Sequence, residues 1–423
     1  MEYNKVVPAV EVGDPNENDE RGGVGEEKLG QILETLSEEV RELSLGTSGT
    51  VDRIKGPPSP LEFLRNYVMP GRPCIITDSL EHWPALRMWS NEYLCSVLKD
   101  QPVSVHFTAD GRADAVVDPS HLLSTYDCPT IGSPDCSLSQ SASSFSKLAT
   151  EDCSRNFADE EESDDDGLLD QAEDDSPGLG FLFVTAYVEK LLFPEALELI
   201  IDGSVGEGQR RGVAYAQQQN GCFLSEYGLL ANDAEVHIPW ATEALGCMPE
   251  AVNLWIGNPG AVTSFHKDHY ENLYAVVAGE KHFTLLPPTD VHRMYVRNYS
   301  AAHYVRMKDS DRFAIVADSP ANTVPWVSVD PYPADIEKAK LKYPRYHGGP
   351  APFICTVRAG ELLFLPSMWF HHVRQSPDPE GRTIAINFWY DMQFDISRGL
   401  CLSDDRELYQ LVRAVGGVSK YCC

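Results

Sequence analysis

The pattern of apolar positions divides the chain into helical margins and a body rich in β-strands. Within residues 26–56, an apolar residue recurs every three or four positions before Gly46, at Leu29, Ile32, Leu33, Leu36, Val40 and Leu43. This spacing predicts an amphipathic helix whose apolar face packs on the body, followed by a linker. Leu408, Leu411, Val412 and Val415 share one helical face and predict a second helix within residues 398–423.

The body, residues 57–397, alternates short apolar runs with Gly, Pro and Asn. Its first half predicts helices at 60–67 and 186–201 and strands at 74–77, 103–107 and 213–219. Its second half predicts strands at 252–256, 261–265, 272–278, 282–286, 353–357, 361–365, 371–374 and 383–390. Many short strands with regular turn signals are typical of a β-sandwich or β-barrel.

Two segments lack the apolar residues that a packed core needs. Residues 1–25 are rich in Gly, Asn and acid, and predict a disordered N-terminus. Residues 128–180 are rich in Ser and acid, with the run DEEESDDD at 159–166, and predict a disordered acidic insertion in the body. The insertion is a solvated tether or, alternatively, an electrostatic docking arm for a basic partner.

Charge and cysteine content narrow the class of protein. The net charge is −30, which disfavours binding to nucleic acid phosphates and to anionic membranes. No apolar run reaches 18 residues, and the first residues lack the pattern of a secretory signal, so we expect no membrane partner. Eleven cysteines without a C-x-x-C pair favour reduced thiols in the cytoplasm, and possible residence in the nucleus.

Candidate chemistry centres on the run Thr263-Ser264-Phe265-His266-Lys267-Asp268-His269. On a strand, His266 and Asp268 face the same side, and about a hundred residues later His371 and His372 supply a further imidazole. Two His and one carboxylate form the facial triad of non-haem Fe(II) oxygenases, which leaves metal positions open for O2 and a co-substrate.

Further polar residues can complete such a site. Lys281 follows the Ala278-Gly279 turn, and we expect it to return over the barrel mouth, where its ammonium can bind the far carboxylate of a dicarboxylic acid. Asn387 and Trp389 share one face of the run at 383–390 and offer an amide and an indole to the cavity.

With these motifs in order, the chain resembles the JmjC oxygenases over most of residues 57–397. The runs that carry the resemblance are VNLW at 252–255, TSFHKDHYENLY at 263–274, GEKHF at 279–283, WFHHV at 369–373 and INFWYD at 386–391. VPW at 324–326 and VDP at 329–331 look like its lysyl hydroxylase subgroup. The resemblance implies a mainly β, double-stranded β-helix of the jelly-roll or cupin type with flanking α-helices.

The resemblance also implies a ligand set. Fe(II) is bound by His266, Asp268 and His371, with His372 and His269 in packing or neighbouring roles. The co-substrate 2-oxoglutarate is held by Lys281 and Thr263, with Asn272, Asn387 and Tyr215 as polar neighbours. Tyr274 and Trp389 line the cavity or pack in the core. O2 is the oxidant, and no side-chain general base is needed.

The activity implied is hydroxylation of a lysine side chain in a protein substrate, with release of succinate and CO2. The resemblance points to translation-associated GTPases as substrates and to a possible homodimer. Demethylation uses the same site, but the chain lacks a zinc-spaced Cys/His reader module and an Arg/Lys-rich tract. A peptidase lacks a clear nucleophile here, and an inactive binding scaffold has no need of the complete set of site residues.

Overall fold

The structure is a computed structural model that describes residue 32 and residues 34–42, 49–118, 180–202, 212–307 and 312–392. The predicted N-terminus at 1–25, the acidic insertion up to residue 179 and the helix expected within 398–423 lie outside these residues. Among the described helices, none is long and apolar enough to cross a membrane.

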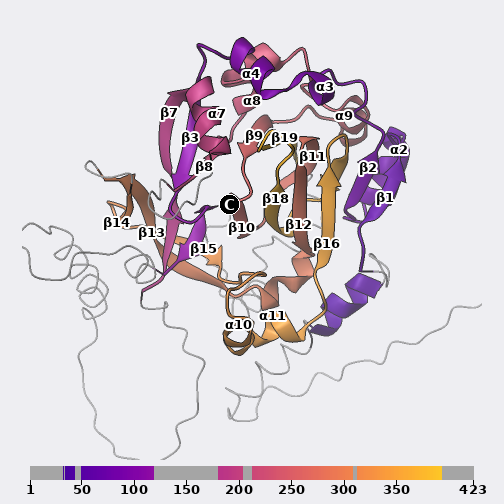
Figure 1. The fold of residues 1–423 in the computed structure, drawn as a ribbon. Coiled ribbons are helices and arrows are strands. Elements are labelled where there is room, and N and C mark those ends of the chain that lie inside the picture. The colour runs from indigo at the N-terminus through magenta and orange to yellow at the C-terminus, as the bar shows by residue number, and fades with distance from the viewer. Residues whose placement is uncertain are drawn as a thin grey trace, which may run out of the picture.

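Two sheets face each other across the body and form a jelly roll, which confirms the predicted fold class. The large sheet has the order β1-β2-β17-β11-β19-β9-β8-β3-β7, and the smaller sheet has the order β16-β12-β18-β10-β4 (Figure 1). Strands of the large sheet are β1 (Asp52–Lys55), β2 (Cys74–Thr77), β3 (Pro102–Thr108), β7 (Tyr187–Leu192), β8 (Val213–Ala216), β9 (Ala251–Gly257), β11 (Tyr270–Ala278), β17 (Leu362–Leu365) and β19 (Thr383–Asp391). Strands of the smaller sheet are β4 (Arg112–Ala113), β10 (Val262–His266), β12 (Glu280–Leu286), β16 (Phe353–Arg358) and β18 (Phe370–Ser376).

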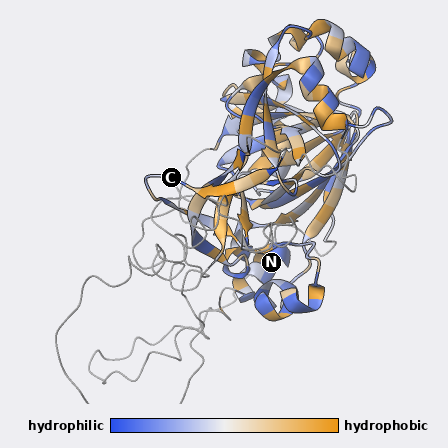
Figure 2. Ribbon diagram, turned by 60° about the vertical axis from the view of Figure 1, so that its left-hand side comes forward, coloured by the Kyte–Doolittle hydropathy of each residue, from blue (hydrophilic) through white to orange (hydrophobic). Residues whose placement is uncertain are grey.

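Strand β11 shows why the large sheet has no solvated face at its centre. Leu273, Ala275 and Val277 pack toward the helices, while Tyr274 and Val276 point into the space between the two sheets. Because side chains alternate between the two faces of the strand, its apolar residues contribute to two separate hydrophobic layers. In Figure 2 the hydrophobic residues follow the strands of the body, and the peripheral helices mix hydrophilic and hydrophobic positions.

Short helices cover the ends of the jelly roll. Figure 1 places α3, α4, α8 and α9 along its upper edge and α10 and α11 along its lower edge. Their bounds, with those of the remaining helices, are α2 (Pro60–Phe63), the π-helix η2 (Leu64–Val68), α3 (Ala85–Met88), α4 (Asn91–Val97), α7 (Phe193–Ile201), α8 (Cys222–Ser225), η3 (Gly228–Leu230), α9 (Pro239–Leu245), η4 (Pro288–Arg293), α10 (Ile336–Lys342) and α11 (Pro344–Gly348).

The helix predicted at 186–201 is wrong in its first half. Residues 187–192 form strand β7, which pairs with β3 and alternates half-buried and exposed positions. Pro194 then stands in the first turn of α7, where its missing N–H costs no hydrogen bond. Pairing with a strand more than eighty residues earlier overrides the local helical pattern.

A third sheet was not predicted. It comprises β14 (Phe313–Ala317), β13 (Val296–Arg306), β6 (Leu182–Thr185) and β5 (Ala115–Val117), with β15 (Thr323–Val327) paired to β13. Three of its five strands lie between residues 296 and 327, and β5 and β6 flank the acidic insertion in the sequence. This sheet therefore joins segments that are distant in the chain.

The N-terminal helix, described at residues 34–40, contacts the body through polar side chains. Ser37 donates to the carboxylate of the fully buried Asp290, and Arg41 pairs with the same carboxylate at 2.5 Å. Ile32 and Leu36 remain 54% and 46% exposed. The predicted apolar packing of these two residues is therefore wrong, because a buried carboxylate requires polar partners and draws that face inward.

Candidate active site

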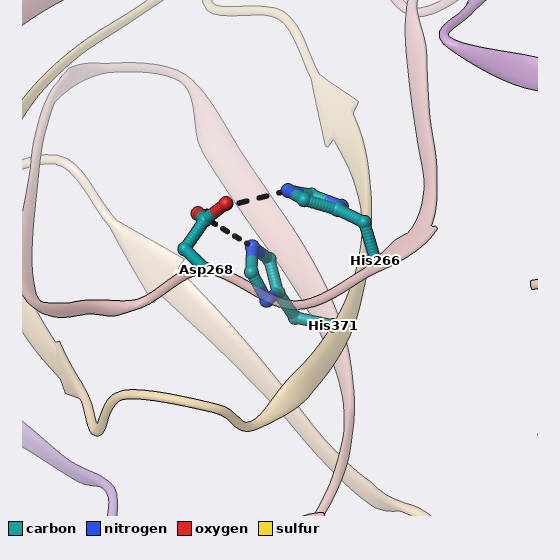
Figure 3. A group of neighbouring side chains, drawn as sticks. All are labelled: His266, Asp268 and His371. Carbon is teal, nitrogen blue, oxygen red and sulfur yellow. Dashed lines mark ion pairs between the residues drawn. The ribbon is translucent and has the colours of Figure 1, made fainter. Parts of the chain in front are cut away.

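Two imidazoles and one carboxylate converge between the sheets. The ligand atoms of His266, Asp268 and His371 lie within 4.8 Å of one another. The Asp268 Oδ2 atom is 3.7 Å from His266 Nε2 and 3.6 Å from His371 Nε2. Figure 3 marks these two contacts with dashed lines. Two nitrogens and one oxygen at this spacing fit the facial triad of a non-haem Fe(II) centre.

The backbone orients both imidazoles toward the centre of the group. Nδ1 of His266 lies 2.9 Å from the Ser264 carbonyl oxygen, and Nδ1 of His371 lies 3.0 Å from that of Trp369. Each Nδ1–H therefore donates to a backbone carbonyl, so that the Nε2 lone pair faces the carboxylate. Burial and the nearby His266 lower the pKa of His371 to about 4, which favours the neutral form that binds metal.

Strand pairing brings the two His together, but it does not place Asp268. His266 on β10 lies opposite His371 on β18, after a break in the ladder that follows Thr263. Asp268 lies beyond the end of β10, and its carbonyl accepts the Met368 N–H at 2.8 Å. The expectation that Asp268 follows His266 on the same strand is therefore wrong; a backbone contact to the turn before β18 holds it instead.

The neighbouring histidines have other surroundings. His372 packs beside Phe265 and Tyr332, at centroid distances of 5.6 Å and 5.5 Å. Neither His372 nor His269 belongs to the described group of candidate metal ligands or to the cavity lining. This placement agrees with the predicted choice of His371 and with packing roles for the other two residues.

Lys281 is buried between the sheets rather than at the barrel mouth. The turn at Gly279 carries the chain from β11 in the large sheet to β12 in the smaller one. The Lys281 side chain is 1% exposed, and its ammonium donates to the Tyr215 hydroxyl at 3.0 Å and to the Gln375 side-chain oxygen. Burial lowers the pKa of Lys281 to about 7, since both hydrogen-bond partners are neutral.

The large sheet contributes a chain of side-chain amides. The Trp255 indole donates to Asn387 Oδ1 at 2.8 Å, and the Asn387 amide donates to Asn272 Oδ1 at 3.2 Å. Register explains the arrangement, because Asn272 and Tyr274 on β11 lie opposite Trp389 and Asn387 on β19. The amide and the indole of β19 therefore face the cavity, as the alternation of residues 383–390 predicts.

A cavity of about 320 Å³ joins these elements. Its walls include all three members of the triad together with Thr263, Asn272, Asn387, Tyr215, Tyr274 and Trp389. Lys281 stands directly behind Tyr215 and Tyr274, 5.2 Å and 6.0 Å from their ring centroids. The predicted residues thus gather around one space, with Lys281 in its second layer.

Sequence reasoning missed several residues of this site. Gln375 is the second partner of Lys281, and Trp255 starts the amide chain. Asp114 and Trp326 line the cavity from the third sheet and the loop beside it. Trp255 and Trp326 lie within the motifs VNLW and VPW of the predicted family, so these motifs could have identified them. Asp114 and Gln375 lie in no such motif.

Comparison with known proteins places this fold and site in a family. Residues 60–396 match the model of the cupin-like domain. The chain belongs to the cupin-like JmjC family of 2-oxoglutarate oxygenases, whose members generally depend on Fe(II).

The relatives include two proteins whose names give different activities. The chain is 48% identical to "Lysine-specific demethylase JMJ32" of Arabidopsis thaliana, over 87% of this chain and 89% of the relative. It is 37% identical to "Bifunctional peptidase and (3S)-lysyl hydroxylase JMJD7" of Homo sapiens, over 86% and 93% of the two chains. It is also 33% identical to "JmjC domain-containing protein E" of Dictyostelium discoideum, over 82% and 85%.

Proposed function

We propose that this protein is an Fe(II)- and 2-oxoglutarate-dependent hydroxylase that acts on a lysine side chain of a protein substrate. The observation that carries the proposal is one cavity with a metal triad in its wall and a buried lysine behind it. The triad suits a divalent metal, and the lysine suits the far carboxylate of a dicarboxylic acid.

Each part of the site has a role in this reaction. His266, Asp268 and His371 would hold Fe(II), which supplies the oxidising chemistry with O2 and 2-oxoglutarate when bound. Lys281 and Tyr215 would bind the far carboxylate of 2-oxoglutarate, and Thr263, Asn272 and Asn387 supply polar contacts along the wall. Trp255 fixes the Asn387 amide, so that its orientation is set before the co-substrate enters.

The first test measures succinate release from 2-oxoglutarate under O2 with added Fe(II). It includes a lysine-bearing peptide from a translation-associated GTPase, and H266A and D268A as controls. Triad-dependent turnover with a mass gain of one oxygen atom on the peptide lysine supports the proposal. Triad-dependent turnover without this product contradicts lysyl hydroxylation, and absence of turnover by folded, iron-loaded protein favours a binding scaffold.

Demethylation is a second candidate because the Arabidopsis relative is named a lysine-specific demethylase. The two reactions differ in which C–H bond lies beside the metal. The same assay with a methylated lysine peptide distinguishes them, since demethylation lowers the product mass by one methylene. Peptidase activity, which the name of the human relative includes, is tested by cleavage of the same peptides.

The choice of partner is a proposal that follows from charge. A net charge of −30 suits a basic, lysine-bearing protein substrate and disfavours nucleic acid and anionic membranes as partners. From the cysteine usage we propose action in the cytoplasm, with the nucleus as a second location. The resemblance suggests a homodimer, which light scattering would test.

A further inference from the structure

One acidic residue lines the cavity without belonging to the metal group. Asp114 lies between β4 and β5 and lines the same space as His266, Asp268 and His371. Strand β4 pairs in parallel with β10, with Arg112 opposite Val262 and Ala113 opposite Thr263, so Asp114 follows in register beside Ser264. Its carboxylate is not part of the candidate metal group.

The backbone of Asp114 is held in an unusual conformation. Its φ is 50°, in the left-handed region that Asp and Asn tolerate better than other non-glycine residues. The Ser264 hydroxyl donates to the Asp114 carbonyl at 2.7 Å, and the Trp326 indole donates to the Ser264 hydroxyl at 3.2 Å. These contacts fix the backbone of a residue that lines the cavity.

The described residues give the Asp114 carboxylate no hydrogen bond or ion pair of its own. Arg112, a cation two positions earlier, pairs instead with Asp330 at 2.9 Å. Burial raises the pKa of Asp114 even though the nearby His266 lowers it. A partly buried carboxylate with no cation from the chain is suited to a cation supplied by a substrate.

Aromatic rings line the same cavity as Asp114. Trp326 packs 4.7 Å from Phe183 and lies parallel to the His266 ring at 6.2 Å. Trp389 stacks on Tyr270 at 5.0 Å, is 7% exposed, and its buried indole N–H has no partner among the described residues. Phe183, Trp326 and Trp389 all line the cavity and offer apolar surface to a chain of methylene groups.

We propose that Asp114 binds the ammonium group of an unmethylated substrate lysine and thereby selects that side chain. This inference rests on the proposed function and names the substrate class of the same site. The ammonium donates charge-assisted hydrogen bonds to the carboxylate, while the methylenes pass between the aromatic walls. Because Asp114 lies outside the metal group, an ammonium held there presents methylene C–H bonds to the metal rather than an N-methyl group.

The chemistry of the contact predicts its selectivity. A trimethylated lysine keeps its charge but has no N–H to donate, so it loses the hydrogen bonds. Norleucine keeps the methylenes and has no cation. Both should therefore bind less tightly than unmethylated lysine, and D114N should remove the difference.

The experiment measures binding by fluorescence anisotropy to the full chain without added metal. The probes are three labelled forms of one peptide from a translation-associated GTPase, with lysine, trimethyllysine or norleucine at the target position. The variants are D114N, D114E and D110N. Asn has nearly the shape of Asp and also tolerates positive φ, so D114N should fold. Asp110 lies in the same segment outside the cavity lining, so D110N is the matched control for loss of one negative charge.

The wild type and D110N should bind the lysine peptide roughly 10- to 100-fold more tightly than the norleucine peptide, the range of one hydrogen-bonded charge pair. D114N should reduce this ratio to within about twofold, and D114E should retain part of it. Because the readout is a ratio within one variant, misfolding, which weakens all three peptides together, does not imitate the result.

Several results would overturn the inference. These are a D114N ratio equal to that of the wild type, equal or absent binding of the lysine and norleucine peptides by the wild type, and tighter binding of trimethyllysine. Asp114-dependent preference for lysine without an oxygenated product leaves the inference standing and refutes the hydroxylase. An oxygenated lysine product with an unchanged D114N ratio supports the hydroxylase and refutes the role of Asp114.

Discussion

The two charged parts of the cavity are opposite in sign and in exposure. At the metal group, Asp268 stands between two imidazoles, and its side chain is 24% exposed. Behind Tyr215, the Lys281 ammonium is buried and has two neutral hydrogen-bond partners. One part therefore suits a cation that enters from the cavity, and the other suits an anion.

This difference shows how one cavity can hold two ligands, each at its own position. Under the proposed function, a metal ion would offset the Asp268 charge, and the far carboxylate of 2-oxoglutarate would offset the Lys281 charge. Each substitution below tests whether the two parts act separately.

The largest effect is expected at the metal group. D268A removes the carboxylate and should lower both Mn²⁺ affinity and turnover by more than about 100-fold. Loss of a residue that only hydrogen-bonds a metal ligand costs up to about 100-fold, and loss of a ligand should cost more. Calorimetric titration with Mn²⁺ measures the affinity. H372N is the matched control, because His372 is a buried neighbour outside the ligand group and should retain metal binding. Equal loss in both variants would contradict the assigned triad.

The next effect is expected at Lys281. K281M keeps the length of the side chain but leaves the far carboxylate of 2-oxoglutarate unpaired, which costs roughly 100- to 1,000-fold in co-substrate affinity. Mn²⁺ affinity should stay within about twofold, because the lysine does not touch the metal group. Competition binding with labelled 2-oxoglutarate measures the first quantity, and parallel loss of Mn²⁺ binding would refute separate roles.

A pH dependence should distinguish the two parts further. The pKa of Lys281 is lowered to about 7 by burial, so above this pH the free protein must take up a proton to present an ammonium to the carboxylate. The Kd of 2-oxoglutarate should therefore rise as pH increases from 7 to 9, by at most tenfold per unit. K281R stays protonated and should show a flat profile. A flat wild-type profile would show that Lys281 remains charged.

The smallest effect is expected from the packing behind Lys281. A Cβ added at Gly257 would lie 2.3 Å from Gln375 Nε2 and 2.7 Å from the Tyr215 ring. G257A should therefore displace both partners of Lys281 and weaken 2-oxoglutarate binding by about tenfold, the loss of one modest hydrogen bond. G348A meets no atom within 4 Å and is the control. An unchanged affinity in G257A would show that these partners do not orient the ammonium.

The sequence by itself determined the second-half strands of the two facing sheets and the residue types of the metal group. Period-two alternation predicts β19, and the predicted cavity face of Asn387 and Trp389 is the observed one. Because side chains alternate between the two faces of a strand, the face on which each one lies follows from the local sequence. The same local reasoning placed Asp268 beside His266 correctly, although the turn after β10, not the strand, holds it there.

Only the tertiary structure decided which distant residues meet. Gln375 reaches Lys281, Asp114 reaches the wall beside His266, and Asp290 draws the polar face of the N-terminal helix inward. Strand β7 likewise became extended because β3 was available to pair with it. These contacts depend on the pairing of segments separated by tens to hundreds of residues, and on the need of buried charges for partners, which no local pattern records.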